Sequence, residues 1–366
     1  MSLLDKLKKP FIVSAVSLGL LLGSVGCVSE EDILPIDENI LFWRSTEEDA
    51  PKLFSVGMNE IETPIFSENI FSDTFQVLSK DNNRMVVIDY NVRAYEEEIG
   101  YAIKLIDLDP NNIETVLEGR SVHGILPLTF FRGDSRLLCA LNPKNILHGW
   151  SSNNPTLLFS IDLETGGNTE KIEPLGELNP FAYFGENPLS QDGENLIYTL
   201  DLEGNSEIFI RNLASEQDIR ITDSEGEEHS PFWFDDNSLL FERVDFRNSE
   251  RSGVYLVDLL DEGINERLVL AGAKYPYTIP FSNNISFVLD GALCLYHLES
   301  GSVVDSVKLP KYHSSNFHWN DGGKYCSFTG GKKGNHLYVI DFESKTKVLL
   351  GEYSNSGIIE ICGWIN

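Results

Sequence analysis

The histidines are the residues of this 366-residue chain best suited to bind a metal ion, and there are seven of them. His229, His313 and His318 lie at or near the starts of predicted strands, so their side chains could converge. With an acid such as Asp321 they would supply the nitrogen and oxygen ligands that many metal ions take. No HxH or HExxH spacing accompanies them. The sequence therefore predicts no metal and no cofactor, and leaves these three histidines as the weak candidates.

The segment "DLEGNSE" (201–207) places polar side chains at alternating positions, as a calcium-binding loop does. Position 12 of such a loop would be Asn212 rather than the expected Glu, so the segment is interpreted as a turn. The chain contains no GxSxG, and "TGGKKGN" (329–335) lacks the spacing of a phosphate-binding loop and is interpreted as a hairpin turn. The sequence predicts no catalytic residues and no enzyme activity.

Four of the five cysteines lie inside apolar runs, far from one another in sequence: Cys139, Cys294, Cys326 and Cys362. No CxxC or CxxCH is present, so neither a zinc site nor a c-type haem is indicated. The favoured interpretation is buried free thiols that act as small hydrophobic side chains. A disulfide between strands remains open for an exported protein.

The fifth cysteine closes an amino-terminal segment typical of export, "MSLLDKLKKPFIVSAVSLGLLLGSVGC". Lysines precede an apolar run that is shorter than a membrane span of about 20 residues. "GSVGC" resembles a bacterial lipobox, although Ser24 stands where Leu is usual, and the resemblance implies lipidation of Cys27. We expect a signal peptide at 1–26 and an acidic tether at 27–37. Because residue 28 is Val rather than Asp, the outer membrane is favoured over the inner; plain secretion and an uncleaved anchor stay open.

One pattern of strands and turns recurs along the remainder of the chain. A turn rich in Asp, Asn and Gly precedes an apolar run, as in "FDDNSLLFER" and "SQDGENLIYTL". A second run follows each, such as "GVYLVDLLD" and "HLYVIDFES", and a short fourth run closes the unit. Four short strands in a repeat of roughly 45 residues are typical of a β-propeller blade.

The two ends of the chain complete one blade between them. Segments 39–45, 51–57 and 60–66 look like the last three strands of a blade, and 358–366 looks like its first strand. Trp364 aligns with Trp319 and Trp233 of other first strands. The sequence thus predicts an all-β fold over 38–366: a seven-bladed β-propeller of four-stranded blades, closed by pairing the carboxyl-terminal strand with the amino-terminal strands.

The repeat at 188–222, with "HSPFWFDD" after it, resembles the TolB-type, WD40-like propeller repeat. Ser190, Asp192 and Gly193 match its first turn, and Pro231 and Trp233 match its last element. The resemblance implies a propeller in the cell envelope. The chain has no room for the separate amino-terminal domain of TolB, so the resemblance does not imply that the chain is TolB or binds the partners of TolB.

Function is expected on the loops that join the second strand to the third and one blade to the next, because long loops on a rigid scaffold carry most binding sites. The longest are 91–100, 142–155, 181–188 and 245–253. They supply the predicted partner-binding residues Tyr95, Glu96, Glu97, Glu98, Trp150, Tyr183, Phe184 and Phe246. Packing of the aromatic side chains over the blades is the equal alternative.

The net charge of −29 argues against binding to nucleic acid and favours a protein partner with a basic surface. We therefore expect a lipid-anchored scaffold for protein interactions in the cell envelope, facing the periplasm or the exterior and touching the membrane only through its anchor. The alternatives are a module that binds glycan or peptidoglycan, and a propeller polysaccharide lyase with a metal site in its channel.

Overall fold

The computed structural model describes residues 39–44, 52–56, 63–64, 72–79, 82–91, 99–108, 112–121, 125–131, 133–141, 155–164, 172–179, 182–185, 188–202, 205–260, 263–280, 282–332, 335–352 and 359–365. Their strands form four-stranded antiparallel sheets, the blades of an all-β propeller. The chain divides into two compact units, Ser72–Lys308 and a terminal unit made of Met1–Phe71 and Leu309–Asn366. Among the described residues, no helix is long and apolar enough to cross a membrane.

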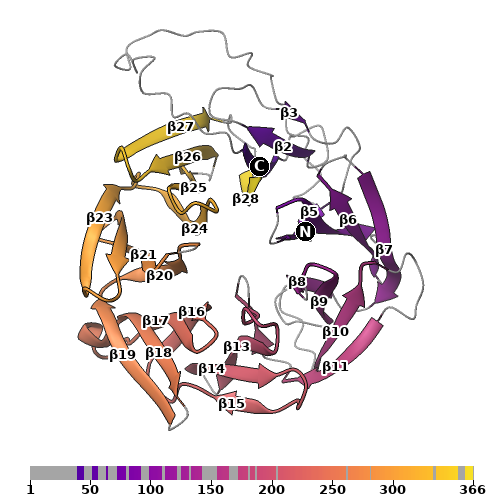
Figure 1. Cartoon of the computed structure of the whole chain (residues 1–366), viewed down its shortest axis with the longest axis horizontal. Coiled ribbons are helices and arrows are strands. Elements are labelled where there is room, and N and C mark those ends of the chain that lie inside the picture. The colour runs from indigo at the N-terminus through magenta and orange to yellow at the C-terminus, as the bar shows by residue number, and fades with distance from the viewer. Residues whose placement is uncertain are drawn as a thin grey trace, which may run out of the picture. The chain divides into compact units, whose positions relative to one another are not determined.

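The Ser72–Lys308 unit contains five blades, each made of four consecutive strands. Their strands are β4 Ser72–Leu78, β5 Arg84–Asn91, β6 Ile99–Asp107 and β7 Asn112–Ser121; β8 Ile125–Phe131, β9 Arg136–Leu141, β10 Thr156–Asp162 and β11 Ile172–Leu178; β12 Ala182–Tyr183, β13 Asn195–Leu202, β14 Asn205–Asn212 and β15 Asp218–Arg220; β16 Glu227–Asp235, β17 Ser238–Val244, β18 Gly253–Leu260 and β19 Gly263–Ala271; and β20 Lys274–Thr278, β21 Asn284–Leu289, β22 Ala292–His297 and β23 Ser302–Lys308. A short 3-10 helix, η4 Ser249–Arg251, lies between β17 and β18. The fourth strand of each blade lies on the outer side of this unit, as β15, β19 and β23 do in Figure 1.

The terminal unit contains two four-stranded sheets. The first consists of β24 His313–Trp319, β25 Tyr325–Gly330, β26 His336–Asp341 and β27 Thr346–Glu352. The second is composite and has the order β28-β1-β2-β3, with β28 Ile359–Ile365, β1 Asn39–Arg44, β2 Lys52–Val56 and β3 Thr63–Pro64. The predicted pairing of the two chain ends is therefore confirmed, with Ile40 opposite Trp364.

The predicted count of seven blades is corrected. Six blades are built from four strands that are consecutive in the sequence, from β4–β7 to β24–β27. The composite sheet takes one strand from the carboxyl-terminal end of the chain and three from the amino-terminal end, so it is not a repeat of four consecutive strands. It belongs to the terminal unit, together with β24–β27. The repeat pattern predicted a seventh blade because the end strands match the blade pattern, although they come from opposite ends of the chain.

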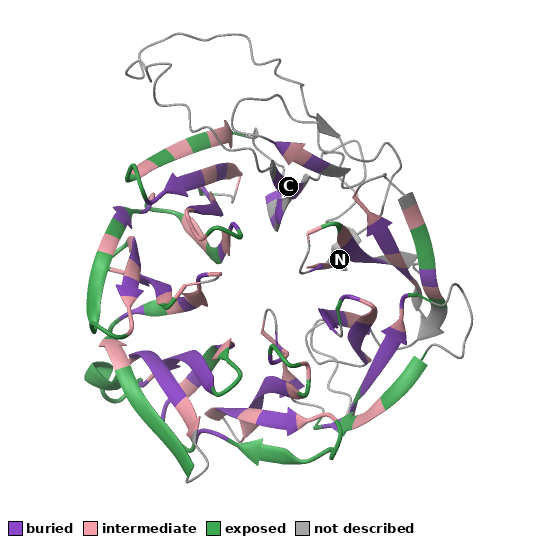
Figure 2. Cartoon of the chain, viewed as in Figure 1, coloured by how far each residue is buried: buried purple, intermediate pink, exposed green. Residues whose placement is uncertain are grey.

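Apolar side chains pack between neighbouring blades. One cluster joins Leu138 and Leu158 of one blade to Leu196 and Tyr198 of the next. The second and third strands carry most of these buried residues, whereas the outermost strands are largely exposed (Figure 2). Burying such a side chain contributes roughly 1.5–3 kcal/mol, so these contacts stabilise the packing of neighbouring blades.

Short polar turns join the first two strands of a blade. In the predicted "SQDGE" turn, Ser190 Oγ donates to Asp192 Oδ1 at 2.6 Å and accepts from Asn195 N at 2.9 Å. Gly193 has a φ of 77°, a conformation that glycine adopts without strain. The "DLEGNSE" segment is likewise the hairpin between β13 and β14, with Leu202 opposite Asn205, as predicted.

Tryptophans at equivalent positions in two first strands each donate a hydrogen bond to the backbone of the preceding blade. Trp233 of β16 donates from Nε1 to the carbonyl oxygen of Pro188 at 3.0 Å. Trp364 of β28 makes the matching bond to the carbonyl oxygen of His318 at 2.8 Å. The sequence alignment of these two tryptophans thus corresponds to a shared contact between sheets.

The cysteines whose side chains the structure describes are buried free thiols: Cys139, Cys294 and Cys326. Burial raises the pKa of the Cys139 and Cys326 thiols far above the usual range. The prediction of buried free thiols is therefore confirmed for these three cysteines. The side chain of Cys362 lies outside the described residues.

Candidate interaction loop and its buried support

Several predicted site residues lie outside the described residues: Cys27, Tyr95, Glu96, Glu97, Glu98 and Trp150. Tyr183 and Phe184 are described, and they correct the prediction of a loop over 181–188. Ala182 and Tyr183 form β12, which pairs with β13. Phe184 packs on an apolar cluster with its ring 6.5 Å from that of Tyr198. Phe184 therefore packs over a blade, which was the alternative to a binding role, because the neighbouring side chains form an apolar surface.

The three candidate metal-binding histidines have separate surroundings. His229, in β16, has its Nε2 3.3 Å from Glu227 Oε2, and both side chains are partly exposed. His313 begins β24 and its Nδ1 donates to the carbonyl oxygen of Ser314 at 2.8 Å. His318 lies farther along β24. Within the part of the chain that the structure describes, no three His, Cys, Asp or Glu side chains gather closely enough to hold a metal ion.

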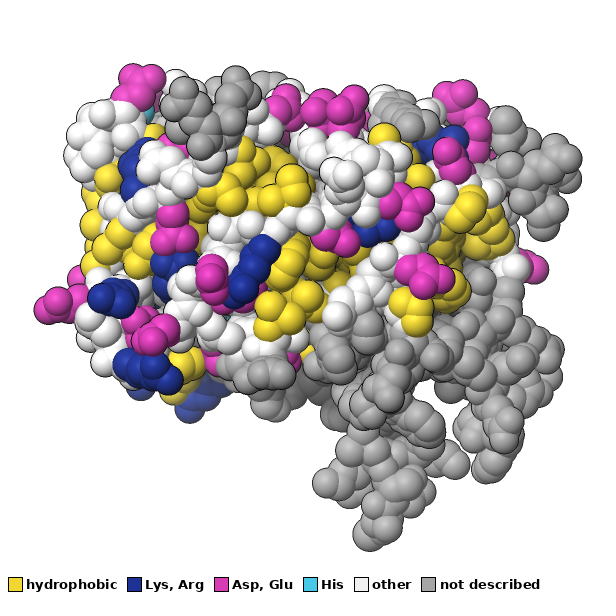
Figure 3. All heavy atoms as spheres, turned by 90° about the horizontal axis from the view of Figure 1, so that it is seen from below, with side chains coloured by type: hydrophobic (Ala, Val, Ile, Leu, Met, Phe, Trp, Pro, Cys, Tyr) yellow, Lys and Arg dark blue, Asp and Glu magenta, His cyan; other side chains and the backbone are white. Residues whose placement is uncertain are grey.

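Phe246 is the predicted anchor that the structure presents to solvent, with 76% of its surface exposed. It belongs to the segment between β17 and β18, residues 245–252, which we call the interaction loop. Exposed apolar side chains also occur on outer strands, such as Ile219 and Ile264, and Figure 3 shows hydrophobic patches among acidic side chains on one face. Of the described large hydrophobic residues, Phe246 has the largest exposed fraction.

The interaction loop is held by its own hydrogen bonds. Asp245 Oδ1 accepts from the backbone N–H of Arg247 at 2.8 Å and of Asn248 at 2.9 Å. These bonds lower the pKa of Asp245, because they favour the ionised carboxylate. Asn248 caps η4 by accepting from Glu250 N, and Ser252 Oγ accepts from Asp245 N at 2.9 Å. The loop therefore offers Phe246 in a fixed position.

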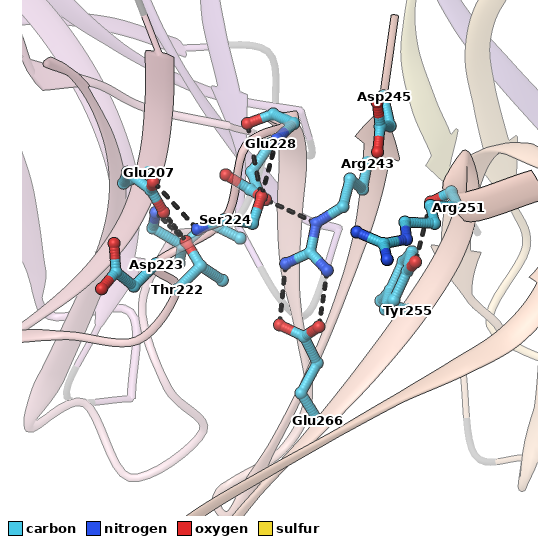
Figure 4. A network of polar contacts seen from close by, with 12 residues as sticks. Glu207, Thr222, Asp223, Ser224, Glu228, Arg243, Asp245, Arg251, Tyr255 and Glu266 are labelled. Carbon is cyan, nitrogen blue, oxygen red and sulfur yellow. Dashed lines mark hydrogen bonds and ion pairs between the residues drawn. The ribbon is translucent and has the colours of Figure 1, made fainter. Parts of the chain in front are cut away.

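Arg243, at the end of β17, lies beneath the interaction loop in a buried ion cluster (Figure 4). Its Nε donates to Glu228 Oε1 at 2.6 Å, and its two terminal nitrogens donate to both oxygens of Glu266 at 2.5 and 2.8 Å. The guanidinium also lies 4.3 Å from the centre of the Tyr255 ring. Burial by itself would lower the pKa of Arg243, but the bonds to Glu266 and Glu228 raise it, so the charge is retained.

Gly226 makes room for this arginine. A Cβ at position 226 would lie 2.8 Å from Arg243 Cγ, which is closer than packed carbon atoms come. The Gly226 backbone N–H instead donates to Ser224 Oγ at 2.9 Å, and Ser224 Oγ donates to Glu228 Oε1 at 2.6 Å. The segment that leads into β16 thus wraps around the cluster.

A second buried carboxylate, Glu207 of β14, continues the polar network towards the preceding blade. Its Oε2 accepts from Thr222 Oγ1 at 2.7 Å, and its Oε1 accepts from Arg220 at 3.0 Å and from Ser224 N at 3.2 Å. Glu207 is 1% exposed, so the hydrogen bonds satisfy a carboxylate that water cannot reach. The segment between β15 and β16 is thereby tied to both blades.

Glu228 is the one member of this network with an unsatisfied atom: its Oε2 has no hydrogen-bond partner among the described residues. Burial raises its pKa to about 7, and the bonds from Ser224 and Arg243 only partly offset this. A carboxyl group with such a pKa could transfer protons near neutral pH. However, Glu228 is 0% exposed and a substrate in solution cannot reach it, so its place in the fold is that of a support for the loop.

Replacing Glu228 with glutamine is expected to flatten the pH dependence of stability. The pKa of Glu228 is about 7 in the folded protein against an ordinary value of 4.5, so the folded state holds the proton more tightly. This proton stabilises the folded state fully when the pH is below the ordinary pKa of 4.5. The stabilisation, on the order of 3 kcal/mol, is lost as the pH rises through the pKa of the folded protein. Urea unfolding from about pH 5 to about pH 8 should show this decline in the wild type and lose it in E228Q.

Glu266→Gln is the matched control for E228Q. It removes the other carboxylate of Arg243, which is partly exposed and has both oxygens bonded. The decline of stability with pH should persist in E266Q. An unchanged decline in E228Q would contradict the assignment to Glu228.

Sequence reasoning missed this network. Its members are separated by 15 residues (Glu228 and Arg243) and by 23 residues (Arg243 and Glu266). The available signal was the pair of adjacent charged residues at the end of the apolar run "SLLFERV". Successive side chains of a strand point to opposite faces, so two adjacent charged residues cannot both lie on the exposed face.

Comparison with protein families found no family model that matches the chain. Comparison with curated proteins found no match either.

Solved structures match the fold. A puromycin-hydrolysing peptidase of Mycobacterium tuberculosis is 11% identical with a TM-score of 0.61, over 87% of this chain and 53% of the peptidase. Prolyl oligopeptidase B of Galerina marginata is 10% identical with a TM-score of 0.58, over 87% and 51%. The chain thus spans about half the length of these peptidases. An oligogalacturonate lyase of Vibrio parahaemolyticus is 14% identical with a TM-score of 0.56, over 87% of both chains. Together these likenesses show that the chain has a β-propeller fold.

Proposed function

We propose that the chain is a non-catalytic scaffold that binds a protein partner through the interaction loop. The observation that carries the proposal is Phe246, an aromatic side chain that is 76% exposed on a loop fixed by hydrogen bonds. Exposing such a side chain to water costs free energy, and burying an aromatic anchor in a partner's pocket is a main source of binding energy in protein interfaces. Because the loop is already ordered, little entropy is lost on binding.

The partner should carry a basic surface around a pocket for Phe246. The chain has 57 acidic and 28 basic residues, so its field attracts cations. Next to Phe246, the exposed Arg247 is already paired with Glu225 at 3.0 Å. The local basic group is thereby partly neutralised, and the surrounding acidic field dominates the approach of a partner.

The cell envelope is the proposed location. The support is the amino-terminal sequence, in which a charged and an apolar segment precede Cys27, together with the likeness of the repeat at 188–222 to TolB-type propellers. Lipidation of Cys27 would hold the propeller at the membrane surface through the tether at 27–37, with the outer membrane favoured.

Among the described residues, the position of the one carboxyl group with a clearly raised pKa favours the scaffold over the lyase alternative. Glu228 is the described carboxyl group with the clearly raised pKa, and it is closed to solvent. A lyase or peptidase needs its reacting groups in contact with the substrate. The interaction loop instead presents an apolar side chain that has no acid–base chemistry.

Phe246→Ala is expected to weaken partner binding by at least about tenfold, as the loss of a central aromatic anchor does. The tagged full chain and the F246A variant would be extracted from native cells under identical conditions, with quantitative mass spectrometry of the proteins retained. A partner bound in stoichiometric amount by the wild type should be depleted with F246A. The same spectra report whether the bait begins at a lipidated Cys27.

Ile219→Ala is the control, since Ile219 is 54% exposed on the outer strand β15 of the preceding blade. It should retain the partner. Equal depletion by I219A and F246A, or no depletion by F246A, would rule out the interaction loop as the binding site. An unlipidated bait with a different first residue would rule out the anchor.

A further inference from the structure

A pocket lies in the terminal unit, where β24 begins and β25 ends, and it has a volume of about 360 Å³. That volume falls in the range of pockets that hold small organic ligands. The pocket is lined by Lys311, Tyr312, His313, Ser314, Thr329, Gly330, Gly331 and Lys332. The lining joins the segment that enters the blade to the segment between its second and third strands.

Backbone pairing and two glycines build this pocket. His313 pairs with Gly330 across β24 and β25, and Gly331 N donates to the carbonyl oxygen of Tyr312 at 2.9 Å. A Cβ at Gly330 would lie 2.7 Å from the Tyr338 ring and 3.0 Å from the carbonyl oxygen of Tyr312. Gly331 has a φ of 86°, which disfavours any other residue. The two walls therefore approach closely only because the turn begins with glycine.

The charge of the pocket is opposite to that of the chain. Lys311 and Lys332 line it, and no Asp or Glu does. Neither lysine forms an ion pair with any residue that the structure describes, whereas Lys324 of the same blade is paired with Glu343 at 2.6 Å. In a chain of net charge −29, two lysines facing one hollow without a carboxylate are a site for an anion.

Further side chains add hydrogen-bonding and stacking groups. Thr329 also lines the pocket, whereas the Ser314 hydroxyl is engaged with the Asn316 carbonyl oxygen and the Thr329 backbone N–H. Tyr312 is 44% exposed, and the Lys311 ammonium lies 5.4 Å from the centre of its ring. An aromatic face beside an ammonium group can contact the apolar side of a ligand while the lysines bind its charge.

We propose that this pocket binds a small organic ligand through a carboxylate or phosphate group held by Lys311 and Lys332. The ammonium groups donate to the oxyanion, and Thr329 and Tyr312 contact the remainder of the ligand. The site lies in a different unit from the interaction loop, so it adds a small-molecule function to the proposed scaffold. Because both lysines are exposed, affinity on the order of millimolar is expected, and it should fall with rising salt.

Isothermal titration of the detergent-extracted full chain tests this proposal with three probes: galacturonate, inorganic phosphate and neutral galactose. Galacturonate and galactose share a sugar ring and differ in the carboxylate. Saturable binding of galacturonate or phosphate, but not of galactose, is expected, and the stronger of the two identifies the oxyanion. The variant K311Q/K332Q should bind that probe at least about tenfold more weakly.

The control is K274Q/K345Q, which removes the same charge at two lysines outside the pocket lining. It should bind like the wild type, and thermal unfolding should show that both double variants are folded. Equal binding by K311Q/K332Q and the wild type would overturn the proposal. So would equal binding of galactose, or the lack of saturable binding by any probe. None of these results depends on Phe246, so the scaffold proposal is tested separately.

Discussion

Replacing Arg243 with methionine is expected to lower the free energy of unfolding by about 3–5 kcal/mol, as breaking a buried ion pair from one side does. Arg243 binds Glu228 at 2.6 Å and both oxygens of Glu266, and it lies over the ring of Tyr255. Methionine fills much of the same volume but leaves the fully buried Glu228 without its positive partner. Urea unfolding near neutral pH, followed by far-ultraviolet circular dichroism, measures the loss.

Two further variants separate charge from packing at this position. R243M/E228Q should recover part of the lost stability, because it neutralises the carboxylate that R243M leaves unpaired. Arg267→Met, an exposed neighbour on β19, should change the free energy of unfolding by less than about 0.5 kcal/mol. A loss below about 1 kcal/mol for R243M would show that the cluster contributes little.

The interaction loop gives this experiment a functional consequence. Arg243 is the penultimate residue of β17 and lies two residues before Asp245, whose carboxylate orders the loop that carries Phe246. If the buried cluster positions the loop, R243M should also weaken partner binding at temperatures where the variant remains folded. Retained binding by a folded R243M would show that the hydrogen bonds of Asp245, Asn248 and Ser252 suffice to hold it.

Trp364→Ala is the second substitution with a large expected effect, again about 3–5 kcal/mol for loss of a buried aromatic side chain. Trp364 is 3% exposed, and its ring lies 6.2 Å from that of Tyr325. Its Nε1 donates to the carbonyl oxygen of His318 at 2.8 Å. It lies opposite Ile40 in the pairing of β28 with β1, so it ties the chain ends to the neighbouring β24. Thermal and urea unfolding measure the effect.

Trp364→Phe is the matched control, because it keeps an aromatic ring and removes the hydrogen bond. It should cost about 1–2 kcal/mol, the range for a lost buried hydrogen bond together with a small loss of packing. Limited proteolysis of W364A should cut first near Asn39–Arg44, the strand β1 that pairs directly with β28. Cleavage that begins instead in the Ser72–Lys308 unit would contradict this role for Trp364.

Local sequence patterns predicted the strands and turns of this protein well. Alternating apolar residues and the turn at Ser190–Gly193 depend on neighbouring residues alone, so they can be recognised without a structure. The burial of the free thiols of Cys139, Cys294 and Cys326 followed from their apolar surroundings in the chain. The pairing of β28 with β1 followed from the incomplete repeats at the two ends, because an unpaired edge strand leaves hydrogen-bonding groups unsatisfied.

The sequence by itself determined the all-β propeller fold with four-stranded blades, and it named Phe246 as a candidate anchor without deciding between exposure and packing over a blade. The tertiary structure decided the rest: the division into two compact units, the packing of Phe184, the cluster around Arg243 and the lysine-lined pocket. The reason is physical. The alternation of residues along a strand determines which side chains share a face of the sheet, but the register of the sheet and the packing of the blades determine which side chains come into contact. Glu228, Arg243 and Glu266 come from three strands, and Lys311 and Lys332 from two loops, so only the folded chain brings them together.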